Sequence, residues 1–280
     1  MNKNIFVCAT DLTVITGANP YKDIEEIYIK YWKKYFKEDY LSVYNELVKK
    51  QLPLKQEETY YECVKRIAKE SNVNIYQELG RCMSSKNTDD LNTGKKNLMD
   101  KIKEKIPESK KEEFTKSFNS LTNTNFGIKY ENKGVDIYIE KTNNRVEFNR
   151  KYHKKVLFEI PSEKDNSIDM WHLGGKLDGL VLDKDNNQYV LEIKNRVNRL
   201  FYSLKEYEKV QCYVYMYLMD IEKTHLVETM KSKKDNSINI IEVQFEAEYW
   251  EIIIEKTMEF IEDFYKFIND KNRKIELLAI

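Results

Sequence analysis

The sequence predicts an α/β protein, with a mixed sheet in its second half and helices around and in front of that sheet. Between residues 145 and 246, short runs of strand length are bounded by turn residues and interrupted by one long helical pattern at 202–219. The first half shows helical spacing instead. With 280 residues, 41% of them hydrophobic, the chain can bury a sizeable core. We expect a single domain, 1–280, with a helical lobe at 22–120 and the core at 126–270.

The first half divides into a terminal segment and a run of helices. Residues 1–21 end in the turn sequence Gly-Ala-Asn-Pro-Tyr. Residues 22–50 place Ile and Tyr side chains at helical spacing, which indicates a core-facing stripe. Residues 56–120 continue as helical segments, with breaks near Pro53, Asn72, Gly80 and Pro107. Lysines interleave with acids there, which is typical of a solvated helical face, with contact to DNA as the alternative.

The second half follows the order expected of an α/β core. Apolar spacing predicts helices at 127–142, 202–219 and 247–270. Strand-like runs lie at 145–149, 154–160, 223–229 and 238–246. A hairpin is predicted at 173–194, where two apolar runs flank an Asp- and Asn-rich turn.

Residue counts exclude several classes of site. Lysine plus arginine and aspartate plus glutamate both number 47, so the formal net charge is zero and a DNA-binding surface requires local segregation of charge. The four cysteines form no CxxC pair and the three histidines form no HExxH motif, which excludes zinc-ribbon, clustered iron–sulfur and zincin spacings. The cysteines are most simply buried thiols in a reducing compartment.

The sequence also predicts where the protein works. It contains neither a signal peptide nor an apolar run long enough to cross a bilayer, so we expect an intracellular protein without a membrane partner. Lys, Asn, Ile and Tyr are frequent and Ala is scarce, which indicates the coding bias of an AT-rich genome. The expected location is the cytoplasm or a viral replication site of such a cell or virus.

The candidate site is built on the predicted hairpin. Asp178 lies in its first strand, and Glu192 and Lys194 lie in its second, where the alternation of a strand places them on one face and Leu191 and Ile193 on the other. Two carboxylates attract a hard divalent cation such as Mg²⁺. An ammonium group can position a water or stabilise charge on a phosphate. This set is what metal-dependent phosphodiester hydrolysis requires.

A charged face of a surface hairpin is the competing interpretation, because acids and lysines are abundant and this spacing arises easily by chance. The context favours hydrolysis: Glu192 lies in the apolar stretch Tyr-Val-Leu-Glu-Ile-Lys, and burying an acid and an amine there costs desolvation free energy. Arg196 and Arg199 follow the strand and are candidate phosphate contacts, with solvated arginines as the alternative.

Three further blocks accompany the hairpin. They are residues 8–21, which contain Thr10; residues 126–138, which contain Glu131 and Gly134; and the QxxxY motif of Gln211 and Tyr215, whose side chains share one helix face. Each block alone has a plain explanation, such as a solvated acid or a core tyrosine. In this order, the four blocks resemble the PD-(D/E)xK nuclease superfamily, and within it the YqaJ and bacteriophage lambda exonuclease group of recombination nucleases.

The resemblance implies a restriction-endonuclease-like core, which is a central mixed sheet flanked by helices, with an N-terminal helical lobe. It also implies two Mg²⁺ or Mn²⁺ ions, bridged by Asp178 and held further by Glu192, the backbone carbonyl of Ile193, and Glu131. Lys194 would orient or help to deprotonate the attacking water.

The resemblance further implies contacts to DNA. Gln211 would hold the lysine or a substrate phosphate, and Tyr215 would shape the site. Thr10 stands where the family has Ser, so the hydroxyl is kept. Lys3 falls near the place of an Arg that is implied to hold a terminal 5′-phosphate; lysine keeps the charge but loses the bidentate fork.

The implied activity is a 5′→3′ exonuclease that acts on linear double-stranded DNA in recombination, repair or replication. The resemblance implies a ring-shaped homotrimer and a single-strand annealing protein as partner. Two alternatives remain: a structure- or site-specific DNA endonuclease, and a non-catalytic DNA-binding protein that keeps the fold. An ATP-driven role is disfavoured, because Gly-Gly-Lys-Leu at 174–177 lacks the spacing of a phosphate-binding loop.

Overall fold

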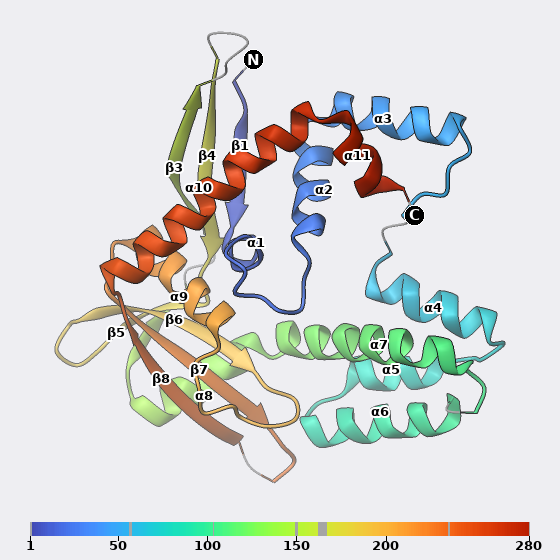
Figure 1. Ribbon diagram of the computed structural model, residues 1–280. Helices are drawn as coiled ribbons and strands as arrows, with labels where there is room; N and C mark the ends of the chain where they lie inside the picture. The colour runs from blue at the N-terminus through green and yellow to red at the C-terminus, as the bar shows by residue number, and fades with distance from the viewer. Residues whose placement is uncertain are drawn as a thin grey trace.

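The computed structural model describes residues 2–55, 58–102, 104–148, 151–161, 167–234 and 236–279. Over these residues the strands form a three-stranded and a five-stranded sheet, both mixed, with helices packed against each (Figure 1). The predicted α/β class is confirmed, although the strands are divided between two sheets. Residues 56, 57 and 103 of the predicted helical segments and residue 149 of a predicted strand lie outside the described residues.

The smaller sheet has the strand order β1-β4-β3. Its bounds are Asn4–Cys8 for β1, Ile168–Lys176 for β4 and Tyr152–Pro161 for β3. β1 runs parallel to β4 and pairs Cys8 with Gly174, and α1 (Ala9–Ile15) follows it directly. The sequence predicts neither β1 nor α1, because a five-residue strand that continues into a seven-residue helix is too short to establish either period.

The larger sheet has the strand order β2-β5-β6-β7-β8. Its bounds are Arg145–Glu147 for β2, Gly179–Leu182 for β5, Gln188–Asn195 for β6, Lys223–Lys231 for β7 and Asn236–Gln244 for β8. β6 and β7 are parallel and are joined by the crossover helix α9 (Glu206–Met219). α9 contacts β4 as well as β6, so it lies where the two sheets meet (Figure 1). α8 (Glu131–Thr142) packs on the other face of β6.

The remaining helices belong to two hydrophobic clusters. α2, α3, α10 and α11 pack with the smaller sheet around buried aromatic side chains; their bounds are Ile24–Tyr35, Lys37–Lys49, Ala247–Asn269 and Lys271–Leu278. α4, α5, α6 and α7 enclose a cluster of their own; their bounds are Tyr60–Glu70, Tyr76–Ser84, Thr88–Ile102 and Glu108–Lys129. We call these last four helices the α4–α7 lobe. The predicted helical range 22–120 is thus shared between two cores.

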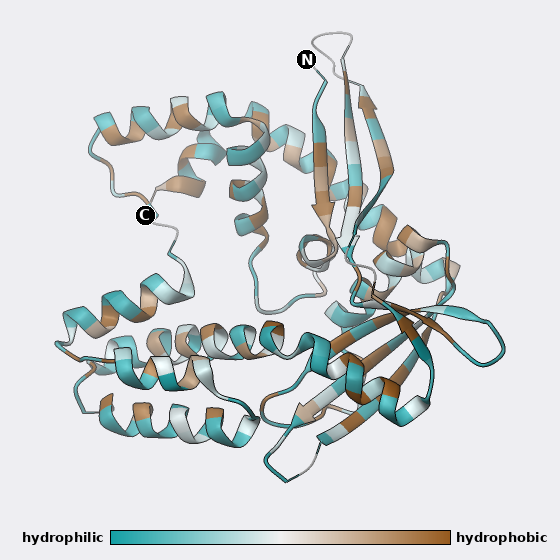
Figure 2. Cartoon of the chain, turned by 180° about the vertical axis from the view of Figure 1, so that it is seen from behind, coloured by the Kyte–Doolittle hydropathy of each residue, from teal (hydrophilic) through white to brown (hydrophobic). Residues whose placement is uncertain are grey.

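The distribution of hydropathy follows this division. In Figure 2 the strands carry much of the hydrophobic colour, whereas the helices of the α4–α7 lobe are largely hydrophilic with hydrophobic residues at intervals. Intervals of this kind are typical of helices that bury one stripe and solvate the rest. Among the described residues, no helix is both long and apolar enough to span a membrane.

One predicted helix, 127–142, is divided in the structure. α7 ends at Lys129 and α8 begins at Glu131. Asn195 of β6 donates its side-chain N–H to the carbonyl of Gly127 at 3.0 Å, and a continuous helix would offer that carbonyl to the N–H of Glu131. A tertiary contact therefore coincides with the break, and α8 then packs on the face of the larger sheet.

Two other boundaries differ from the prediction. The predicted helix at 202–219 begins only at Glu206, because residues 201 and 202 donate their backbone N–H groups to the buried carboxylate of Glu228. The first strand of the predicted hairpin is interrupted: β4 ends at Lys176 and β5 begins at Gly179. That interruption is where the chain passes from one sheet to the other.

Candidate active site

Asp178 lies in the short link between the two sheets. Leu177 anchors this link, because its side chain is buried. Asp178 Oδ2 accepts a hydrogen bond of 2.7 Å from the backbone N–H of Ile193, which holds the carboxylate against β6. The N–H and C=O groups of one strand residue point to the same side of the strand, so the carbonyl of Ile193 faces Asp178 too.

β6 presents its acid and its amine to α9, as the alternation predicts. Lys194 Nζ donates to Glu192 Oε1 and to Gln211 Oε1 of α9, each at 2.7 Å. Ile193 points to the opposite face and packs with α8. The structure thus joins the QxxxY helix to the strand through a direct hydrogen bond between Gln211 and Lys194.

The amine of Lys194 stays charged at neutral pH. Burial lowers its pKa, but the nearby carboxylates, Glu192 first among them, outweigh burial and raise the pKa above its ordinary value. The side chain of Lys194 is 21% exposed and that of Glu192 is 8% exposed. An ammonium group has three N–H donors, so the bonds to Glu192 and Gln211 leave one donor for a water or a phosphate oxygen.

The surroundings of Asp178 disfavour its charged form, whereas those of Lys194 favour the charged amine. Burial raises its pKa well above the ordinary value, and Glu192 and Glu131 raise it further. The N–H of Ile193 and the amine of Lys194 lower the pKa of Asp178 without cancelling this effect. The three acids therefore share one neighbourhood with a single amine. Carboxylates and a backbone carbonyl are the oxygen ligands that Mg²⁺ and Mn²⁺ accept, so the residues fit the metal that the resemblance implies.

Glu131 reaches this neighbourhood because α8 packs very closely on β6. It is the first residue of α8, and a Cβ added to Gly134, on the next turn, would overlap Ile193 Cγ2. The side chain of Glu131 is exposed and lies within electrostatic reach of Asp178. Within the part of the chain that the structure describes, Glu131 forms no hydrogen bond or salt bridge, so its carboxylate can serve as a ligand.

We expect Gly134→Ala to lower the free energy of unfolding by about 1–3 kcal/mol, because the new methyl group would press α8 away from Ile193. Glu131 would move with the helix, away from Asp178. Gly127→Ala is the matched control: nothing lies within 4 Å of its added Cβ, and better helix propensity should stabilise the protein by about 0.5–1 kcal/mol. Urea unfolding measures both variants, and equal effects would contradict the close packing.

Tyr215 lies on the same face of α9 as Gln211, four residues further along the helix. Its ring packs on Gly175 of β4, where an added Cβ would lie 2.6 Å from Tyr215 Cε1. Burial first, and then Glu192 and Asp178, raise the pKa of the Tyr215 hydroxyl far above its ordinary value, so the group remains neutral. Tyr215 is therefore an uncharged, bulky side chain close to Glu192 and Asp178, a position that suits the predicted role of shaping the site.

Thr10 and Lys3 are the two predicted DNA contacts near the amino terminus. Thr10 lies at the end of the smaller sheet that is nearer to Asp178. It is exposed on the first turn of α1, directly after β1, and its Oγ1 lies 3.1 Å from Cys8 Sγ. Cys8 pairs with Gly174, four residues before Asp178. Thr10 therefore lies at the end of the smaller sheet from which the chain continues to Asp178.

Lys3, the expected contact to a terminal 5′-phosphate, lies at the other end of that sheet, far from the acids. Its carbonyl accepts a hydrogen bond from the N–H of Met170, eight residues before Asp178, which corresponds to roughly 25 Å of extended chain. Its ammonium lies 4.5 Å over the ring of Phe36. The parallel register of β1 with β4 directs this residue away from the acids, and single-sequence patterns do not reveal register.

Arg196 is also not the free phosphate contact that the sequence suggests. Its guanidinium bonds Glu228 at 2.8 Å and Glu208 at 2.8 Å. The side chain of Arg196 is 11% exposed, and those of Glu228 and Glu208 are 0% and 1% exposed. Two buried carboxylates already neutralise this cation, so Arg196 acts as a structural tie between β6, β7 and α9. Arg199 is exposed.

Asn195 is a site neighbour that the sequence patterns do not single out. Its Nδ2 donates to the carbonyl of Gly127 and its Oδ1 accepts from Thr229 Oγ1 at 2.7 Å. It therefore ties β6 and β7 to the end of α7, immediately before the helix that carries Glu131. The signal that could have indicated it is its position two residues after Ile193, on the face of β6 that meets α8.

A second group of potential ligands lies in the α4–α7 lobe. Glu58, Cys63 and Glu113 bring their ligand atoms within 4.8 Å of one another. Arg66 donates to Glu58 at 2.8 Å and to Glu113 at 2.6 Å, so a guanidinium already supplies the positive charge there. This group is an ion-pair cluster with a buried thiol, and it lacks the excess negative charge found around Asp178.

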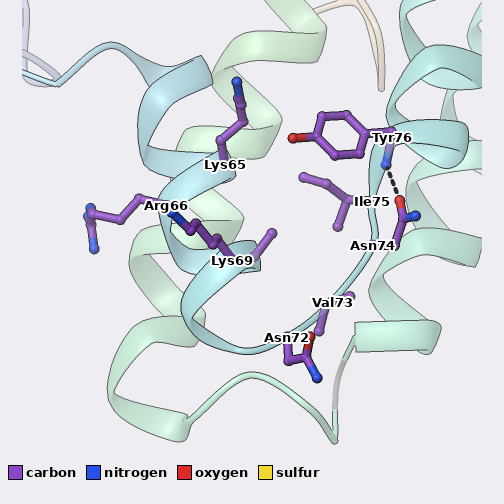
Figure 3. A pocket seen from close by; sticks show the side chains of 9 residues that line it. Lys65, Arg66, Lys69, Asn72, Val73, Asn74, Ile75 and Tyr76 are labelled. Carbon is purple, nitrogen blue, oxygen red and sulfur yellow. Dashed lines mark hydrogen bonds between the residues drawn. The ribbon is translucent and has the colours of Figure 1, made fainter.

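A pocket of about 560 Å³ lies beside this cluster, between α4 and the start of α5 (Figure 3). Its lining is basic, amidic and apolar; it consists of Lys65, Arg66, Ala68, Lys69, Asn72, Val73, Asn74, Ile75 and Tyr76. This lining contains no carboxylate that could hold a cation or act as a base. Metal-assisted hydrolysis therefore cannot be placed in this pocket, and the candidate active site remains the acidic link between the sheets.

Fold and site together define an α/β protein with an acidic, lysine-containing site suited to a divalent cation. The chain is similar to an alkaline exonuclease (LHK-Exo) from Laribacter hongkongensis, at 15% identity and a TM-score of 0.38 over 69% of this chain and 88% of that chain. The same enzyme in complex with dAMP gives 14% identity and a TM-score of 0.37, over 69% and 87%.

A phage-related exonuclease from Haemophilus somnus 129PT is similar at 12% identity and a TM-score of 0.38, over 52% of this chain and 72% of that chain. No protein-family model and no curated protein matches the sequence. These structural likenesses are distant and carry no functional argument.

Proposed function

We propose that the protein is a metal-dependent deoxyribonuclease that hydrolyses phosphodiester bonds at the link between its two sheets. One observation carries this proposal: a charged lysine with one unused donor stands in the same neighbourhood as three carboxylates from three separate segments, Glu131, Asp178 and Glu192. A merely structural salt bridge would need one carboxylate. Asp178 is buried beside Glu192, which raises its pKa and makes its charged form costly, so its position calls for a functional reason.

Each residue of the site has a distinct part in this reaction. A divalent cation held by Asp178, Glu192, Glu131 and the carbonyl of Ile193 would supply positive charge to the scissile phosphate and lower the pKa of a bound water. Lys194 donates its remaining N–H to the attacking water or to a phosphate oxygen and thereby orients it.

The two residues of α9 support this arrangement. Gln211 fixes the direction of the lysine through its 2.7 Å hydrogen bond. Tyr215 closes the site toward β4 without adding charge. Thr10, whose hydroxyl is exposed at the same end of the smaller sheet, is the proposed contact to a substrate phosphate.

The finer parts of the proposal follow from the sequence resemblance. They are 5′→3′ polarity on linear duplex DNA, two Mg²⁺ or Mn²⁺ ions, a role in recombination, repair or replication, a homotrimer and an annealing protein as partner. Duplexes labelled at the 5′ or the 3′ end distinguish the polarity by the size of the first labelled product. Light scattering of the purified protein measures the oligomeric state.

Purified protein should degrade linear duplex DNA when Mg²⁺ is present, and Lys194→Ala should reduce the rate by about 10²–10³-fold, because the donor to water or phosphate is lost. Lys3→Ala is the matched control, since Lys3 lies at the far end of β4, and it should retain the wild-type rate. Gel electrophoresis of end-labelled DNA measures both. Equal digestion by Lys194→Ala and wild type would remove the assignment.

A closed circular DNA duplex, incubated with the same purified protein, distinguishes an exonuclease from an endonuclease and from a non-catalytic DNA-binding protein. An exonuclease needs an end, so circular DNA should persist while linear DNA disappears. Cleavage of the circle would favour a structure- or site-specific endonuclease. DNA binding without cleavage of either substrate, together with no uptake of Mg²⁺ or Mn²⁺ in calorimetry, would favour a non-catalytic protein.

A further inference from the structure

One face of α9 leads from the candidate active site to the protein surface. Tyr215, Gln211 and Tyr207 are spaced by four residues and therefore share this face. Tyr215 is buried beside the acids, Gln211 bonds Lys194, and Tyr207 is only partly buried. Burial and Glu208 raise the pKa of Tyr207, whereas Arg196 and, more weakly, Lys194 lower it, so both cations lie within electrostatic reach of this ring. Tyr207 lies about 6 Å along the helix from Gln211.

A second tyrosine from a distant segment stands against Tyr207. The ring of Tyr21 meets the ring of Tyr207 edge to face, with 6.0 Å between centroids and an interplanar angle of 76°. Tyr21 is 70% exposed, so most of its ring surface is not covered by the protein. Leaving a large aromatic side chain in water forfeits the free energy that its burial would provide. The exposure of Tyr21 therefore calls for an explanation.

The turn that carries Tyr21 is firmly braced in this exposed position. The N–H of Asn19 donates to the carbonyl of Thr13 at 2.9 Å, and its side-chain N–H donates to Thr13 Oγ1 at 3.3 Å. Asn19 Oδ1 accepts from the N–H of Tyr21 at 3.0 Å. Gly17, at φ +72°, supplies the left-handed turn that the chain needs here. The Gly-Ala-Asn-Pro-Tyr sequence thus presents the ring toward α9 at no gain in core packing.

An aromatic pair with one largely exposed ring and one half-buried ring, close to the proposed hydrolytic site, suits a nucleobase. Every base has a π face, so stacking on tyrosine needs no donors or acceptors of a particular sequence. A base that stacks on protein has left the stack of its own duplex, and this costs least at an unpaired end. We propose that Tyr21 and Tyr207 form a stacking platform for an unpaired nucleobase next to the scissile phosphate. The inference rests on the proposed function, because that function places the phosphate at Lys194.

Binding of single-stranded oligonucleotides tests the platform. Fluorescence anisotropy, with Ca²⁺ in place of Mg²⁺, compares an intact oligonucleotide with one whose terminal nucleotides are abasic at both ends. Wild type should bind the intact strand about 5- to 150-fold more tightly. Tyr207→Ala and Tyr21→Ala should lose most of this preference, and Tyr207→Phe should keep it. Tyr76→Ala, which removes a 61% exposed tyrosine of the α4–α7 lobe, should behave as wild type.

The outcomes separate the platform from the hydrolytic function. Equal wild-type affinity for intact and abasic strands, or no binding of either strand, would overturn the platform. A loss in Tyr76→Ala as large as that in Tyr207→Ala would overturn it as well. If the wild type fails to cleave DNA but discriminates against abasic ends through Tyr21 and Tyr207, the nuclease assignment falls and the base-binding platform stands. Circular dichroism of each variant confirms that the fold is kept.

Discussion

Asp178→Asn is expected to abolish DNA hydrolysis and, in the absence of divalent ions, to raise the melting temperature above that of the wild type. The substitution keeps an oxygen that can accept from the N–H of Ile193, which is 2.7 Å away in the wild type. It removes a negative charge that is close to Glu192 and Glu131. Loss of a central metal ligand should reduce the rate by more than about 10³-fold.

The gain in stability depends on pH in a defined direction. Burial, then Glu192 and Glu131, raise the pKa of Asp178 in the folded protein. A carboxyl group of this kind binds its proton more tightly when folded, so the wild type loses stability as pH rises from the ordinary carboxyl pKa through the raised one. The uncharged variant escapes this loss. The difference in melting temperature should therefore be largest at neutral and alkaline pH and should vanish in acid.

Melting curves of both proteins between acid and neutral pH, with EDTA and then with Mg²⁺, measure this effect. Mg²⁺ should stabilise the wild type and leave Asp178→Asn nearly unchanged, because a ligand stabilises only the folded protein that binds it. Asp185→Asn, at an exposed position in the turn between β5 and β6, is the matched control and should change neither stability nor rate. A metal-free Asp178→Asn protein that melts below the wild type at neutral pH would contradict the electrostatic account.

Arg196→Ala is expected to lower the free energy of unfolding by about 3–5 kcal/mol, the usual cost of breaking a buried ion pair from one side. Glu208 and Glu228 would keep their charges with almost no solvent exposure. Glu228 also holds the backbone N–H groups of Phe201 and Tyr202, so the loop between β6 and α9 should loosen as well. The pKa of Arg196 is raised above its ordinary value by these carboxylates in spite of burial, which shows a charged guanidinium.

Chemical denaturation of Arg196→Ala and Arg199→Ala measures this contribution. Arg199 is exposed in the same loop, so its removal should change stability by less than about 0.5 kcal/mol. A phosphate contact at Arg196 would give the reverse pattern: normal stability, with weaker binding of DNA whose salt dependence is reduced. That result would restore the interpretation that the sequence alone suggested.

Local periodicity was sufficient to predict the elements that matter most for the site. The alternation of β6 predicted which face carries Glu192 and Lys194, and the four-residue spacing of Gln211 and Tyr215 predicted one face of α9. The hydrogen bond between Lys194 and Gln211 joins these two predictions. Such patterns can be read from sequence because a side chain's direction depends on the geometry of its own strand or helix.

The sequence by itself therefore determined the α/β class, the hairpin whose second strand carries Glu192 and Lys194, and the helix that faces this strand. Only the tertiary structure decided that Lys3 lies far from the acids, that Arg196 is neutralised by Glu208 and Glu228, and that the helix breaks before Glu131. These features depend on strand register and on contacts between segments far apart in the chain. Their free energy comes from burying complementary surfaces together, and no period along a single sequence records which surfaces those will be.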